Sequence, residues 1–262
     1  MVYLFNKKYD SIFLNAWLRL IFAFFISFAL SFFVGIFFIQ ILKISPEAIF
    51  QFSTKRVSYV FPILETGVEL GLDRGIMLFI WNTLGALATI SFLYTAPLFN
   101  PDNISLFPKS IRKAFCGRKR MKLLCFLPGC QKIDAESLRR LYVWLMIPWL
   151  GMILLGLESG MTVSTSSYLF GSYLVGFVSL IPHGIIEIPT IAYAGAVTFT
   201  AHILVKEKTK RSITARVFDD LNSYTSEVPL LKIIVIVILF LLLAGLVEGH
   251  VTFKIIDTLL SK

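Results

Sequence analysis

Charged residues are scarce in this sequence. They make up 16% of the 262 residues, whereas hydrophobic residues make up 56%; soluble domains carry about 25% charged residues. A soluble fold of this length has too little interior to cover so much apolar surface. The composition therefore excludes an ordinary soluble domain, and the mean hydropathy of +0.79 indicates an integral membrane protein.

Cysteine and histidine are equally sparse, with three residues of each. Cys116, Cys125 and Cys130 all lie in one basic segment. An odd number of cysteines with no histidine nearby excludes a disulfide framework and a complete zinc site there, so we expect free thiols. The sequence also lacks a nucleophile elbow, a phosphate-binding glycine loop and a serine, histidine and acid set. We therefore expect no enzymatic activity, no metal and no cofactor.

The apolar residues gather in long stretches, and about 20 of them suffice to cross a bilayer as a helix. The sequence predicts an all-α protein whose single polytopic membrane domain, residues 1–262, has membrane segments at 19–42, 75–97, 141–157, 168–205 and 230–252. The fourth segment would be about 55 Å long as one straight helix, which is too long for a simple crossing. It must therefore be broken, dip in and out, or cross twice.

The basic residues decide among these alternatives. They cluster in two segments, 98–140 and 206–227, between the apolar runs. This pattern marks cytoplasmic loops, so we expect no nucleic-acid partner despite the net charge of +9. An odd number of crossings must then separate the end of the third segment from the second basic segment. We predict five transmembrane helices in the cell membrane, with a cytoplasmic N-terminus and an outer C-terminus.

The remaining segments are expected to be connections. Residues 1–18 mix aromatic and apolar residues with charged ones, which predicts a short helix on the inner membrane surface. Residues 43–74 have a similar mixture, which predicts short segments that lie on the bilayer surface. Residues 158–167 are expected to form the turn after the third span. His202, near the end of the fourth segment, is expected at the membrane interface.

The fourth segment contains four residues that are unusual in lipid: Pro182, His183, Gly184 and Glu187. Pro182 cannot donate its backbone hydrogen bond and Gly184 weakens a helix, so the break is predicted near Pro182-Gly184. His183 and Glu187 are four residues apart and share a helix face. They are candidates for a metal-ligand pair, a proton-handling pair, or a buried hydrogen-bonded pair that stabilises the broken helix. Two ligands do not complete a zinc site, so the third interpretation is preferred.

Two further polar residues complete the candidate centre. Glu248 lies near the outer end of the last segment when residues are counted from Leu230, whereas His183 and Glu187 are expected deeper. Contact between them is therefore not expected unless the break tilts the two helical pieces. Asn82, in the second segment, falls nearer the level of Glu248. We predict either an Asn82–Glu248 hydrogen bond or an outward cavity that both line.

Small residues recur at four-residue spacing, a pattern that permits close helix packing. The pairs are Gly156 and Gly160 near the third segment, Gly245 and Gly249 in the fifth, and Ala192 and Ala196 in the fourth.

The stretch Pro182-His183-Gly184-Ile185-Ile186-Glu187-Ile188-Pro189 resembles the signature of the stage II sporulation protein M family, a PHGxxE motif. Phe79-Ile80-Trp81-Asn82 is similar to the family's second span, and Leu246-Val247-Glu248-Gly249-His250-Val251-Thr252 to its closing stretch. The resemblance covers about residues 70–97 and 141–253.

The resemblance implies a multi-span scaffold, because the founding member belongs to a membrane complex with cell-wall-degrading enzymes and is thought to anchor them. Our leading hypothesis is a non-enzymatic membrane scaffold or anchor. Its expected partners are the lipid bilayer, other membrane or envelope proteins and, as a candidate, further copies of the same chain. The first alternative is a transporter or permease component with its polar site at the broken helix. The second is an intramembrane metallohydrolase that uses His183, Glu187 and either Glu248 or His250.

Overall fold

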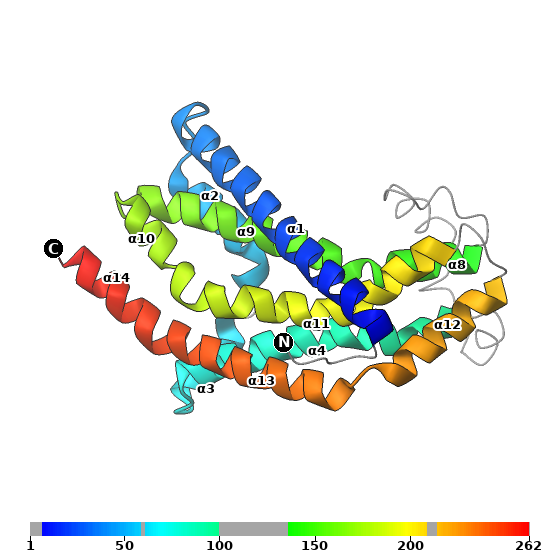
Figure 1. The fold of residues 1–262 in the computed structure, drawn as a ribbon. Helices are drawn as coiled ribbons and strands as arrows, with labels where there is room; N and C mark the ends of the chain where they lie inside the picture. Colours follow the sequence, from blue (N-terminus) through cyan, green and yellow to red (C-terminus); the bar gives the residue numbers. More distant parts are fainter. Residues whose placement is uncertain (1–6, 59–60, 100–135, 209–213, 262) are drawn as a thin grey trace.

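The computed structural model describes residues 7–58, 61–99, 136–208 and 214–261, and these residues form helices joined by short turns, with no strand among them (Figure 1). Five helices or helix pairs are long and apolar enough to cross a membrane. They are Tyr9–Gln40, Arg74–Phe99, Ser137–Leu169, Tyr173–Lys206 and Leu230–Leu260. The all-α class and the number of spans are confirmed.

Successive spans run in alternating directions (Figure 1). Helix α1 (Lys7–Gln40) begins beside α12 (Thr214–Glu227), where the rings of Tyr9 and Tyr224 meet edge to face at 5.2 Å. Its far end lies beside the end of α9 (Ile147–Leu169), where Gln40 donates a 2.5 Å hydrogen bond to Tyr168. We call the end of the bundle at which α1 begins the α12 end. The opposite end is the α14 end, named after α14 (Phe253–Leu260) at the C-terminus. The two basic segments attach at the α12 end, as predicted, while the side of the membrane that this end faces stays a prediction.

The first span begins earlier than predicted. Residues 7–18 are not a separate surface helix but the first turns of α1. No helix breaker separates them from the apolar run, and Trp17 donates a 2.9 Å hydrogen bond to the Pro189 carbonyl in the neighbouring α11 (Ile181–Lys208). This contact fixes the start of α1 against the bundle.

Residues 158–167, predicted as a turn, are helical and belong to α9. Their small polar side chains allow close packing instead of ending the helix. Ser164, Thr165 and Ser167 are buried and donate to carbonyls of their own helix. A Cβ on Gly156 or Gly160 would collide with the backbone of α1 at Phe24 and Phe28. The predicted role of these glycines is confirmed.

Short helices connect the spans. Helices α2 (Pro46–Ser58) and α3 (Phe61–Glu69) precede α4 (Arg74–Thr95), which continues into the turn η1 (Ala96–Phe99). Asp73 caps α4, because its carboxylate accepts a 3.1 Å hydrogen bond from the Ile76 amide. Helix α8 (Glu136–Leu145) leads into α9 after a turn at Met146, and Pro148 lies in the first turn of α9, where proline is tolerated.

Candidate functional site

The break in the fourth span lies two residues ahead of Pro182. After a turn at Gly171, whose φ of 65° suits glycine, the short α10 (Tyr173–Val178) runs back along α9. Ser179 and Leu180 form the turn, and α11 starts at Ile181. Pro182 therefore occupies the first turn of α11, where its missing N–H costs no helical hydrogen bond. The predicted break is confirmed, and it places His183 at one end of a 28-residue helix.

The fifth span is also irregular. Helix α13 (Leu230–Leu246) passes into a π-helical turn, η3 (Val247–Thr252), before α14 begins. A π turn holds an extra residue, which rotates the side chains that follow it, and such turns are frequent at functional sites. Glu248 lies in this turn, at the level of the first turns of α11.

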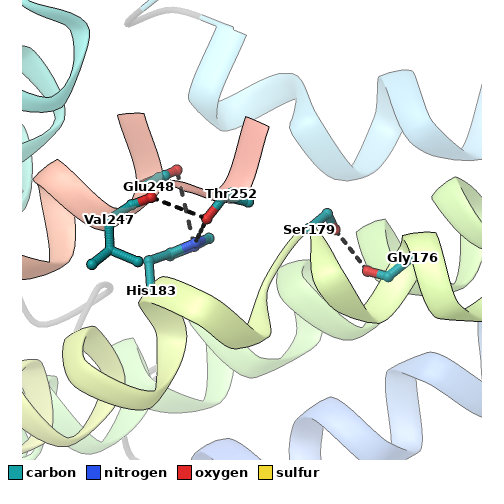
Figure 2. A network of polar contacts seen from close by, with 6 residues as sticks. All are labelled: Gly176, Ser179, His183, Val247, Glu248 and Thr252. Atoms are coloured by element: carbon teal, nitrogen blue, oxygen red, sulfur yellow. Dashed lines mark hydrogen bonds and ion pairs between the residues drawn. The ribbon is translucent and has the colours of Figure 1, made fainter. Parts of the chain in front are cut away.

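His183, Glu187 and Glu248 converge. Each offers one ligand atom, and these three atoms lie within 4.8 Å of one another. His183 Nε2 is 3.9 Å from Glu248 Oε1, and its Nδ1 is 3.4 Å from the hydroxyl of Thr252 (Figure 2). That hydroxyl in turn donates to the Val247 carbonyl at 3.3 Å. We call His183, Glu187 and Glu248 the polar cluster.

The polar cluster is largely shielded. His183 is 7% exposed and Glu187 is partly buried. The Glu248 side chain keeps 25% of its surface accessible. Just before His183, Ser179 donates a 2.7 Å hydrogen bond to the Gly176 carbonyl, which closes the end of α10 (Figure 2). The cluster thus lies at the contact of α11 with η3, with one carboxylate reaching the surface.

The prediction that Glu248 lies away from His183 and Glu187 was wrong. It assumed that the histidine lies midway along its span, but α11 begins only two residues before it. Asn82 does not join the cluster, and the described residues show no hydrogen bond between Asn82 and Glu248. Helices α4 and α13 are antiparallel, and Gly75 faces Gly245 and Gly249. Asn82 is seven residues beyond Gly75, or about 10 Å further along α4.

The close approach of α4 to η3 confirms the predicted packing role of the glycine pair in the fifth span. A Cβ on Gly249 would lie 2.7 Å from the backbone of Gly75. Beside this contact, the exposed His250 Nε2 lies 3.1 Å from Asp73 Oδ2. The glycines bring the start of α4 against one face of η3, while α11 contacts another.

Two contributing residues were missed. Thr252 follows Glu248 by four residues, a spacing that marks a shared face, and it orients His183. Asp73 precedes an apolar run as helix caps often do, and it reaches His250.

His202 was expected at the interface, but it is buried. It is 4% exposed and stacks on Phe199 with ring centroids 5.1 Å apart. Its Nδ1 lies 3.0 Å from the Tyr142 carbonyl of α8, which satisfies the ring in the interior. Cys116, Cys125 and Cys130 lie outside the described residues, so the prediction of free thiols stays untested.

The sequence model of the stage II sporulation protein M family matches residues 120–253, just over half of the chain. The chain belongs to this family. The match includes the whole polar cluster, whereas Asn82 and the rest of the second span lie outside it. The chain is also 29% identical over 121 residues to an uncharacterized protein of Methanocaldococcus jannaschii. That alignment covers 41% of this chain and 52% of the relative, so the chain matches about half of the relative's length. No solved structure matches this stage II sporulation protein M family member.

Proposed function

We propose that this protein is a non-enzymatic membrane scaffold that anchors or localises other membrane or envelope proteins. The observation that carries the proposal is the placement of the polar cluster. Its contacts run between His183 of α11 and Glu248 and Thr252 of η3, so they join two spans. Such contacts supply a rigid bundle, which is what an anchor requires. The role implied by the sequence resemblance agrees with this interpretation.

A second feature supplies a surface for a partner. An apolar groove of about 560 Å³ lies between α1, α2 and α9. Its walls are lined by Leu30, Ser31, Val34, Phe52, Ser53, Lys55, Leu157, Glu158 and Met161. None of the polar cluster lines this groove, so the binding surface and the cluster are separate. We assign the groove to an apolar helix of a partner membrane protein, because two of its three walls are membrane spans.

Site-specific photocrosslinking in membranes of the source organism tests the scaffold. A photoreactive phenylalanine analogue at Phe52, which is 79% exposed in the groove, should give a discrete crosslinked protein. The matched control is Leu239, which is 60% exposed on α13 and lies away from the groove. Replacing His183 and Glu187 by alanine should lower folded yield and partner recovery together. Equal crosslinking at the two sites, or none at either, would contradict the proposed surface.

A transporter or permease component is the second candidate, and the convergence of polar groups at a broken helix favours it. Proteoliposome flux separates the two functions. A transporter requires solute or ion flux that Glu187→Gln abolishes in protein that is still folded. A scaffold requires no flux above that of empty liposomes, with partner recovery sensitive to the same cluster.

A further inference from the structure

The polar cluster combines one imidazole and two carboxylates from two different spans. His183 lies in the first turn of α11, Glu187 follows one turn later, and Glu248 projects from η3. The three ligand atoms lie within 4.8 Å of one another. Nitrogen and oxygen ligands of this kind, held by packed helices, are those that first-row divalent metals take in proteins.

The contacts of His183 leave its Nε2 without a hydrogen bond to any described residue, on the side where a metal ion would lie. The Thr252 hydroxyl gives its proton to the Val247 carbonyl, so toward His183 it acts as an acceptor. This arrangement suits the tautomer with its proton on Nδ1, in which the lone pair of Nε2 points to the side of Glu248. Metal-binding histidines are oriented in the same way, because their second nitrogen donates to a neighbouring oxygen.

The two carboxylates also lie close together without a lysine or arginine beside them among the described residues. Neither Glu187 nor Glu248 forms an ion pair with a lysine or arginine in the described part of the chain, and the salt-bridge partner of Glu248 there is His183. Two negative groups this close in a low-dielectric setting repel each other strongly. A proton on one carboxylate or a divalent cation between the two removes this repulsion, and of the two only the cation also uses the imidazole of His183 as a ligand.

We propose that His183, Glu187 and Glu248 bind one divalent transition-metal ion, with Zn²⁺ as the best fit. With bonds of about 2.1 Å, ligands around tetrahedral zinc lie about 3.4 Å apart. The separations in the cluster, 3.9 Å between His183 Nε2 and Glu248 Oε1 and up to 4.8 Å among the three ligand atoms, shorten to this value by side-chain rotation. The ion would enter from the surface past the partly exposed Glu248 carboxylate, and a water molecule would be the fourth ligand of the tetrahedron. Such an ion clamps α11 to η3, independently of whether the protein serves as a scaffold.

The test is Zn²⁺ titration of the full chain in detergent, after chelator treatment, in competition with a chromophoric chelator. Thiols are first blocked with N-ethylmaleimide, so that Cys116, Cys125 and Cys130 do not bind the ion. We expect one Zn²⁺ per chain. Glu187→Gln and Glu248→Gln keep the side-chain shape but remove a charged ligand, and each should weaken binding more than 100-fold.

A matched pair at Thr252 covers the case in which the glutamate variants fail to fold. Thr252→Val should weaken binding about 10- to 100-fold, as loss of an outer hydrogen-bond partner commonly does, and Thr252→Ser should restore it. Glu47→Gln, which makes the same glutamate-to-glutamine change at an exposed glutamate of α2 outside the cluster, should bind as the wild type does. The proposal is overturned if the wild type binds no stoichiometric Zn²⁺, if folded glutamate variants bind normally, or if Thr252→Val binds as tightly as Thr252→Ser. Binding of Mn²⁺ in place of Zn²⁺ overturns the assignment to zinc.

Discussion

Gly75 and Gly85 lie on the same helix, α4, but face different surroundings. A Cβ on Gly75 would lie 2.7 Å from the Gly245 carbonyl oxygen, about 0.7 Å short of the 3.4 Å at which ordinary contact begins. The obstructing atom is backbone, so α4 and α13 must move apart. A Cβ on Gly85 meets nothing within 4 Å. The same substitution, glycine to alanine, therefore separates the cost of the close approach from the intrinsic preference for alanine in a helix.

Gly85→Ala gains the preference of alanine in the middle of a helix, which is about 0.5–1 kcal/mol over glycine, and Gly75→Ala gains at most this, because Gly75 lies in the first turn of α4. Only Gly75→Ala also overpacks the interface, which costs about 1–3 kcal/mol. We therefore expect Gly75→Ala to be less stable than Gly85→Ala by about 1–3 kcal/mol. Reversible unfolding in mixed micelles with increasing SDS, followed by far-UV circular dichroism, measures the difference. Equal free energies of unfolding for the two variants would refute the packing that we describe between α4 and α13.

Three further outcomes follow from single contacts. Tyr224→Phe removes the 2.9 Å hydrogen bond from the phenol to the Val197 carbonyl and should lower the free energy of unfolding by about 0.5–1.5 kcal/mol in the same assay. Burial raises the pKa of Tyr224 above that of an unfolded tyrosine, so as the pH rises the unfolded state loses its proton first. The free energy of unfolding should therefore fall above about pH 10, and Tyr224→Phe should reduce this fall. Thr198→Val removes the 2.6 Å hydrogen bond to the Thr89 carbonyl, between α11 and α4, and should cost about 0.6 kcal/mol, measured by SDS unfolding.

The membrane spans could be predicted because they depend on composition over about 20 residues. The distribution of basic residues fixed the parity of the crossings, and Pro182 marked the broken span. Helix boundaries were less predictable. Gly160 and Ser164 lie in a stretch that looks like a turn in sequence, yet they pack against α1. A serine in lipid satisfies itself on its own helix, as Ser167 does with Val163, so small polar residues do not end a transmembrane helix.

The convergence of the polar cluster could not be predicted by counting residues along straight helices. The level of His183 depends on where α11 begins, and this depends on α10 folding back against α9. The direction of Glu248 depends on the π turn in η3, for which the sequence carries no simple pattern. The i,i+4 spacing predicted only the pair of His183 and Glu187, which is local to one helix.

The polar cluster and the contact between Gly75 and Gly249 lie on two faces of the same π turn, η3. Gly249 presses on the backbone of Gly75, while the adjacent Glu248 points toward His183. The position of Glu248 is therefore set by α4 as much as by α11, although α4 contributes no ligand. It follows that Gly75→Ala should weaken Zn²⁺ binding as well as stability, whereas Gly85→Ala should change neither binding nor the cluster. If Gly75→Ala loses stability but binds Zn²⁺ as the wild type does, α4 does not position η3.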